Sequence, residues 1–192
     1  MLRRVPSLIL LSSALLWVGC ADATVENSLL SPTEQLPTST PDPEPTAYVV
    51  PAEFQNAATE SLCKRLSEIR ALPSKDPNDT DPIYESLIAR GDAALPCLIE
   101  EVANAKKMRD PRQAPVWQYY AVGDTAVFII LRLVSKRNDD RWMELMLDSL
   151  PQSSREEWKT NGVYAYFNYV SESQNRKKLQ VWWRDWMKKN KK

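Results

Sequence analysis

The residue types that most enzymes use for chemistry are scarce in this chain of 192 residues. Histidine is absent, which excludes the catalytic triads, metal sites and pH switches that depend on an imidazole. The carboxylates that lie close in sequence are direct neighbours, as in Glu100-Glu101, Asp139-Asp140 and Glu156-Glu157. Neighbouring residues of a helix point about 100° apart, so such a pair cannot act on one bond as acid and base. We therefore expect no catalytic residue, no metal and no cofactor.

The segment between residues 109 and 124 has the composition of an interface. Arginine, tryptophan and tyrosine are the side chains that most often anchor a bound partner, and all three are concentrated here. The segment leads to the N-terminus of an apolar helix, where free backbone N–H groups favour anions. We predict a ligand or partner site formed by Arg109, Asp110, Arg112, Trp117, Tyr119, Tyr120 and Asp124.

The same segment also has a purely structural interpretation. In that case Trp117 and Tyr120 pack on the core, and Arg112 pairs with an acid of the same domain. Asp124 stands where a helix-capping carboxylate is common, and such a carboxylate would itself fill the position of an anion.

The C-terminal segment, residues 173–192, carries eight lysines or arginines and a single acid. Helical spacing places Leu179, Trp182, Trp183 and Trp186 on one face, so the segment resembles an amphipathic helix of a membrane interface. The alternative is that this face belongs to the core. In either case we expect Lys188, Lys189, Lys191 and Lys192 to contact anionic lipid headgroups or a cell-wall polymer.

Cys63 and Cys97 also allow two interpretations. In an exported protein an even pair of cysteines indicates a disulfide, which here would close a loop of 34 residues. In the chain-entropy model, closing a loop of this length raises the free energy of unfolding by about 3–4 kcal/mol. Without the bond, both cysteines would be small buried apolar side chains.

Apolar residues recur with a helical period from residue 54 onwards, and no alternating strand pattern is evident. The fold is predicted to be all-α, with Asp81-Pro82 and Ser153-Ser154 as helix starts, Gly91 as a helix end and Gly162 as a kink. The helix at 123–134 is apolar almost all round and should be central. About seven helices are expected, over residues 54–72, 82–90, 92–102, 123–134, 138–150, 153–170 and 173–189.

A short helix, a glycine turn and a second helix with an early proline follow one another in residues 82–105. This arrangement resembles one repeat of the HEAT type, and the resemblance implies an irregular HEAT-like helical stack. No second copy occurs at a period of about 40 residues, which argues against a regular array.

The N-terminus has the features of an export signal. Arg3 and Arg4 precede a mostly apolar run from residue 8 to 18, which is too short to span a membrane. The sequence Trp17-Val18-Gly19-Cys20 resembles the bacterial lipobox, although that family prefers leucine at the position of Trp17. The resemblance implies removal of residues 1–19 and lipidation of Cys20. The alternatives are a signal peptide that is cut elsewhere and an uncleaved anchor.

In the lipoprotein family, an aspartate directly after the cysteine retains the protein at the inner membrane. Ala21 occupies this position, so the resemblance implies sorting to the outer membrane, facing the periplasm. Residues 21–53 then contain six acidic residues, six prolines and no basic residue. This composition predicts that residues 20–53 are a disordered, extended tether with a reach of roughly 100 Å, and that residues 54–192 fold.

The sequence thus predicts a cell-envelope lipoprotein with a non-catalytic, helical binding or scaffolding domain. Its expected partners are the membrane, through the lipid, and a protein or cell-wall polymer. The equal numbers of basic and acidic residues argue against nucleic acid. Two alternatives remain: a hydrolase using two carboxylates about 5–9 Å apart in a helical cleft, and a small inhibitor of an exported toxin or hydrolase.

Replacing Cys20 with serine tests the lipoprotein prediction. The resemblance implies that the Cys20 thiol forms a thioether with a diacylglyceryl group that carries the fatty acids, so Cys20→Ser should abolish incorporation of labelled palmitate and leave residues 1–19 attached, as measured by intact mass. The matched variant Ala21→Asp should keep the label and move from the outer to the inner membrane on a density gradient. An unmodified thiol at Cys20 in the unaltered protein would contradict the prediction.

Overall fold

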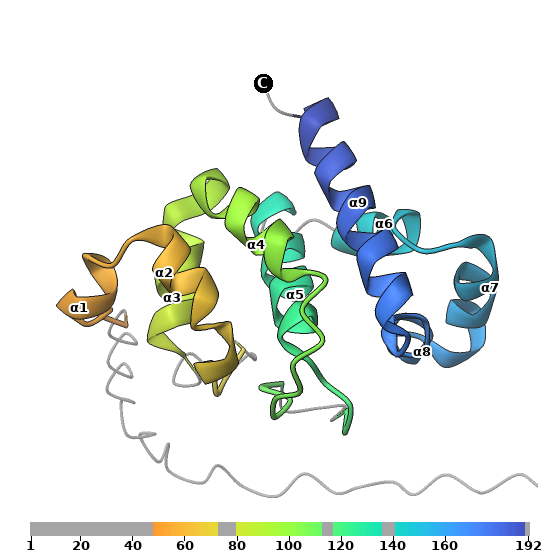
Figure 1. Ribbon diagram of the computed structural model, residues 1–192, viewed down its shortest axis with the longest axis horizontal. Coiled ribbons are helices and arrows are strands. Elements are labelled where there is room, and N and C mark those ends of the chain that lie inside the picture. The colour runs from red at the N-terminus through yellow and green to blue at the C-terminus, as the bar shows by residue number, and fades with distance from the viewer. Residues whose placement is uncertain (1–47, 73–79, 113–116, 136–140, 191–192) are drawn as a thin grey trace, which may run out of the picture. The chain divides into compact units, whose positions relative to one another are not determined.

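The computed structural model describes residues 48–72, 80–112, 117–135 and 141–190 (Figure 1). These residues confirm the all-α fold, because their only β pairing is an isolated bridge between Lys107 and Ala121. The helices are α1 (Ala52–Gln55), α2 (Thr59–Lys64), η1 (Leu66–Glu68, 3₁₀), α3 (Pro82–Arg90), η2 (Gly91–Ala94, 3₁₀), α4 (Leu95–Glu101), α5 (Val122–Val134), α6 (Arg141–Asp148), α7 (Gln152–Asn161), α8 (Tyr164–Val170) and α9 (Ser173–Asn190).

Helix α5 is the central helix, as the sequence predicts. Every residue from Val122 to Val127 is buried, and α3, α4 and α6 pack against it. Figure 1 shows α5 between α2 and α3 on one side and α6 and α9 on the other. Gly123 permits the close approach of α4, because a Cβ atom there would lie 2.2 Å from the carbonyl oxygen of Val102.

A buried carboxylate joins α5 to the two helices at the C-terminal end of the domain. Oδ1 of Asp124 accepts hydrogen bonds from the Tyr166 hydroxyl (2.8 Å) and from Nη1 of Arg176 (2.7 Å). Oδ2 accepts from Nη2 of Arg176 (3.0 Å) and from the backbone N–H of Ala121 (2.8 Å). Asp124 is completely buried and Arg176 is 4% exposed. All four lone-pair positions of the carboxylate are therefore used.

The surroundings keep both partners of Asp124 protonated. Burial lowers the pKa of the Arg176 guanidinium, but the hydrogen bonds and charge of Asp124 outweigh this effect and raise the pKa above its usual value. Burial, together with the negative charge of Asp124, raises the pKa of Tyr166 well above its usual value. The tyrosine hydroxyl consequently remains a donor throughout the physiological pH range.

The structure contains a disulfide between Cys63 of α2 and Cys97 of α4, whose Cα atoms are 6.0 Å apart. The structure therefore confirms the predicted disulfide rather than two separate buried thiols. The bond ties the first helices of the domain to the α4 helix that packs on α5.

The single helix predicted over residues 54–72 is wrong, because the structure divides this segment into α1, α2 and η1. The reason lies in α3: Nη2 of Arg90 donates to the carbonyl oxygens of Gln55 (2.8 Å) and Ala57 (2.7 Å). Ala58 is extended and precedes the first turn of α2. The buried face was nevertheless predicted correctly, since the structure buries Leu62, Leu66, Ile69 and Leu72.

The helix predicted over residues 153–170 also forms two helices. Gly162 has a φ of +56°, a conformation that L side chains rarely adopt, and it separates α7 from α8 instead of kinking one helix. The helix start predicted at Ser153-Ser154 is wrong as well, because α7 begins at Gln152, after Pro151, and has no side-chain cap. These two divided helices account for the difference between the seven predicted helices and the nine α-helices among the described residues.

Other predicted boundaries are confirmed. Asp81 caps α3, with Oδ1 accepting the backbone N–H groups of Ile83 (2.9 Å) and Tyr84 (3.3 Å), and Pro82 takes the first helical position. Gly91 ends α3 with a φ of +57°. The unit predicted at residues 82–105 is present as α3, η2 and α4, while HEAT-like stacking stays a prediction.

Some predicted segments fall partly or wholly outside the described residues. These are the signal at 1–19, the tether up to residue 47 and the first three residues of the helix predicted at 138–150. The predicted C-terminal boundary of the tether is wrong, since Ala52 and Glu53 belong to α1.

In the described part of the chain, no helix combines the length and apolar character needed to span a membrane.

The pair formed by Asp124 and Arg176 leads to a test by double-mutant cycle. Asp124→Leu or Arg176→Met leaves one charge buried without its partner, which should lower the free energy of unfolding by about 3–5 kcal/mol. Asp124→Leu/Arg176→Met leaves no unpaired charge, so it should lose much less than the sum of the two single losses. Urea unfolding measures all three values. Additive losses would contradict the coupling.

Candidate functional site

The seven residues predicted as one site, from Arg109 to Asp124, do not form a common surface. Asp124 and Tyr120 are completely buried. Asp110 is also buried and accepts three hydrogen bonds from the backbone and side chain of Arg112 and one from the backbone N–H of Trp117 (2.8 Å). Only Tyr119, at 52% exposure, and Arg109 remain largely exposed.

Aromatic packing explains why Arg112 and Trp117 are partly buried rather than exposed. The guanidinium of Arg112 lies over the rings of Tyr120, Phe128 and Phe167, at 5.2, 5.0 and 4.6 Å from their centroids. The indole of Trp117 stacks on Phe167 at 5.2 Å. These contacts are those of the structural interpretation, and partner binding by the exposed residues of this segment stays a prediction.

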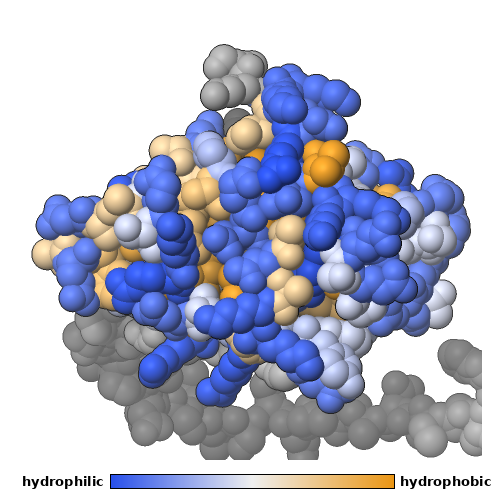
Figure 2. Space-filling model, in the orientation of Figure 1, coloured by the Kyte–Doolittle hydropathy of each residue, from blue (hydrophilic) through white to orange (hydrophobic). Residues whose placement is uncertain are grey.

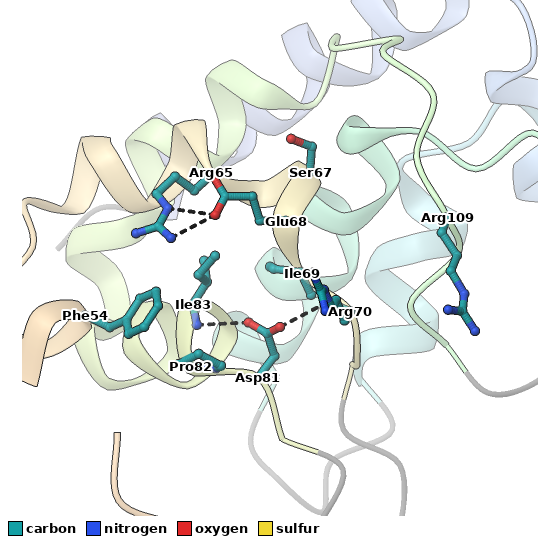
Figure 3. A pocket seen from close by; sticks show the side chains of 10 residues that line it. All are labelled: Phe54, Arg65, Ser67, Glu68, Ile69, Arg70, Asp81, Pro82, Ile83 and Arg109. Atoms are coloured by element: carbon teal, nitrogen blue, oxygen red, sulfur yellow. Dashed lines mark hydrogen bonds and ion pairs between the residues drawn. The ribbon is translucent and has the colours of Figure 1, made fainter. Parts of the chain in front are cut away.

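Arg109 instead lines a pocket of about 660 Å³ with residues that lie far from it in sequence (Figure 3). Its walls come from α1, from the segment around η1, from the start of α3 and from the segment that precedes α5. The pocket is lined by Phe54, Arg65, Ser67, Glu68, Ile69, Arg70, Asp81, Pro82, Ile83 and Arg109, and we call it the arginine pocket.

Local backbone structure brings Arg65, Arg70 and Arg109 to this pocket. In a continuous helix, side chains five residues apart, such as Arg65 and Arg70, point about 140° apart. Ile69 is extended and ends η1, which frees Arg70 from that constraint. The backbone N–H of Leu72 donates to the carbonyl oxygen of Pro111 (3.0 Å), and this bond holds the segment of Arg109 beside residues 69–72.

The two carboxylates of the arginine pocket are already engaged. Nε and Nη2 of Arg65 donate to Oε2 of Glu68, at 3.0 and 2.8 Å, and these bonds lower the pKa of Glu68 below its usual value. Oδ1 of Asp81 caps α3, and its Oδ2 accepts the backbone N–H of Arg70 (3.0 Å). Figure 3 shows both sets of bonds at the pocket wall.

Arg70 and Arg109 contribute positive charge that these acids do not neutralise. Both residues are exposed, and within the described ranges neither guanidinium makes a hydrogen bond or ion pair. The pocket therefore has three guanidiniums and two carboxylates, which gives it one net positive charge. Among the described residues, the N–H donors of the Arg70 and Arg109 guanidiniums have no acceptor. Such an arrangement can bind an anion, and the planar fork of arginine suits a carboxylate or phosphate.

Sequence reasoning identified only Arg109 among the residues of this pocket. Arg65 and Arg70 were assigned to one long amphipathic helix, and Asp81 was assigned to a helix cap. The periodicity of residues 54–72 gave no signal for the break after η1, because the buried residues keep the same spacing in the broken helix.

The remaining candidate residues lie at the C-terminal end of α9. Leu179 and Trp183 are buried and Trp182 and Trp186 are partly buried against the core, so the tryptophan face does belong to the core. Lys188 and Lys189 are exposed in the last turn, and Lys191 and Lys192 lie outside the described residues. No cluster of three or more acidic residues or cysteines that could hold a metal occurs among residues 48–190 where the structure describes them.

Comparison of the chain with protein families, with characterised proteins and with solved structures finds no match. The functional conclusion therefore depends on the geometry of the site itself.

Proposed function

We propose that the chain is an exported lipoprotein whose helical domain is a non-catalytic binding module, and that its arginine pocket holds an acidic segment of a partner protein. The observation that carries this proposal is the pair of free guanidiniums, Arg70 and Arg109, in a pocket of about 660 Å³. Among the described residues, the buried Arg176 and the mostly buried Arg112 pair with carboxylates, whereas Arg70 and Arg109 make no side-chain hydrogen bond or ion pair there.

The pocket suits a carboxylate on a peptide better than a free phosphate. Phosphate sites commonly use the free N–H groups of a helix N-terminus, but at α3 those groups are bound by Asp81, whose negative charge also repels an anion. Phe54, Ile69 and Ile83 form an apolar floor, and the cavity is larger than a single anion requires. An acidic side chain next to an apolar one matches both features.

A hydrolytic function has less support. A general acid needs a carboxyl with a raised pKa, whereas the pKa of Glu68 is lowered by the hydrogen bonds from Arg65. Asp81 uses both carboxylate oxygens to bind backbone N–H groups. These are the carboxylates that line the arginine pocket, and neither is arranged to transfer a proton.

Several features support export and anchoring in the envelope. Disulfides such as the one between Cys63 and Cys97 form and persist in oxidising compartments. The resemblance of residues 17–20 to the lipobox supplies the anchor at Cys20, and Ala21 favours the outer membrane, facing the periplasm. The acidic segment that follows would let the module reach partners away from the bilayer.

Site-directed crosslinking in intact cells of the source organism tests the function. A photo-crosslinking amino acid in place of Ser67, in the pocket wall, should capture a partner peptide that carries aspartate or glutamate beside an apolar residue. Arg70→Gln/Arg109→Gln removes two charged hydrogen-bond donors, worth about 1.5–3 kcal/mol each, so the adduct should decrease at least about tenfold. The adduct is quantified by mass spectrometry.

The matched control is Lys177→Gln/Lys178→Gln, which removes the same charge from exposed positions of α9. This variant should retain the adduct. An adduct that persists in Arg70→Gln/Arg109→Gln, or one that maps to a segment without acidic residues, would reject the arginine pocket as the binding site. Thermal melting of each variant verifies that the fold is unchanged.

A further inference from the structure

The C-terminal end of α9 extends beyond the last fully buried residue of the helix. Trp183 is the last buried residue of α9, so the seven residues that follow it add about 10 Å of helix without a fully buried side chain. Figure 1 shows this end projecting past the neighbouring helices, and Figure 2 shows apolar surface beside the same part of α9, bordered by hydrophilic side chains.

A second pocket, of about 460 Å³, lies beside this end of α9. It is formed by the start of α4, the end of α5 and the last turns of α9. Its lining is mostly apolar, with polar groups only from Asp92 and Asn190. The apolar residues are Leu95, Pro96, Leu133, Val134, Trp186 and Met187, and we call it the α9 pocket.

Positive charge surrounds the same end of the helix. The Lys188 side chain is 75% exposed, and its only acidic neighbour among the described residues is Asp185, at 3.6 Å. Lys189 is exposed and has no ion pair within the described part of the chain. An apolar pocket with a tryptophan and a methionine is thus adjacent to two ammonium groups that point into solvent.

We propose that this end of α9 contacts the surface of a bilayer that contains anionic phospholipid. Lys188 and Lys189 bind the headgroup phosphates, while Trp186, Met187 and the α9 pocket take up the apolar part of the lipid at the interface. A neutral bilayer would leave the lysines without a partner, and a soluble anionic polymer would leave the apolar pocket empty. An anionic lipid surface satisfies both halves of the site.

This site goes beyond the proposed function, because it involves neither the arginine pocket nor acylation of Cys20. It would hold the helical domain against the membrane even in the absence of the lipid anchor. The core of the described residues uses no buried side chain before Phe54, so residues 48–192 contain that core and lack the leader and Cys20.

Vesicle co-sedimentation of residues 48–192 tests the proposal. We expect the protein to bind vesicles of phosphatidylglycerol and phosphatidylcholine in equal parts at least about tenfold more tightly than pure phosphatidylcholine vesicles. Each lysine near an anionic surface contributes about a fivefold effect, so Lys188→Gln/Lys189→Gln should reduce binding about 25-fold. Met187→Ser should also reduce binding, because it removes an apolar side chain of the pocket.

The matched control is again Lys177→Gln/Lys178→Gln, which removes the same charge about 15 Å away along the helix. It should leave most of the binding intact. The proposal fails if this control loses as much binding as the Lys188→Gln/Lys189→Gln protein, or if both kinds of vesicle bind equally. It also fails if soluble dextran sulfate competes fully and Met187→Ser has no effect, since the site would then recognise an anionic polymer.

Discussion

The docking of the C-terminal helices on the central helix depends on the hydrogen bonds of one buried carboxylate. Asp124 closes the first turn of α5 by accepting the backbone N–H of Ala121, and it also binds the side chains of Tyr166 in α8 and Arg176 in α9. These contacts span 52 residues of sequence. A buried charge is costly unless it is fully paired and hydrogen-bonded, so α8 and α9 have to dock in one orientation on α5. The carboxylate thereby specifies an arrangement that apolar packing alone would leave less defined.

The position of the α9 pocket follows from this arrangement, whereas the arginine pocket depends on other contacts. Gln180 of α9 donates to the carbonyl oxygens of Ile99 (3.0 Å) and Glu100 (2.7 Å) at the end of α4, and the C-terminal end of α9 lies beside the start of α4 and the end of α5. On the other side of the domain, Arg90 and the disulfide fix α1 and α2, and α1 together with the segment that follows α2 supplies walls of the arginine pocket. Arg90 and Arg176 use their guanidiniums for contacts within the domain. Arg70, Arg109, Lys188 and Lys189 are exposed and can bind ligands.

The sequence predicted most of the core but only part of the candidate site, for a physical reason. Helical periodicity indicates which side chains are buried, and it identified α5, the face of α9 and the buried face of residues 62–72 correctly. It does not report long-range hydrogen bonds: the contacts of Arg90 that break the first helix cross more than 30 residues, as do those of Arg176. For Arg112 and Trp117 the sequence allows both a partner site and internal packing, and the structure has the internal packing, with both residues bonded to the buried carboxylate of Asp110. The arginine pocket arises from the same long-range contacts, and only Arg109 was foreseen.

An alkaline titration of tyrosine absorbance at 295 nm tests the central role of Asp124 most directly. The pKa of Tyr166 is raised in the folded protein, whereas an unfolded tyrosine ionises near pH 10. Its contribution to stability is therefore complete below about pH 10 and is lost as the pH rises above that value, with one proton more released on unfolding than in Tyr166→Phe, or about 1.4 kcal/mol per pH unit. We predict that the unaltered protein and Tyr166→Phe have the same absorbance change until the fold is lost. A difference between them that titrates near pH 10 while the protein stays folded would show that Tyr166 does not donate to a buried Asp124, and would contradict this account.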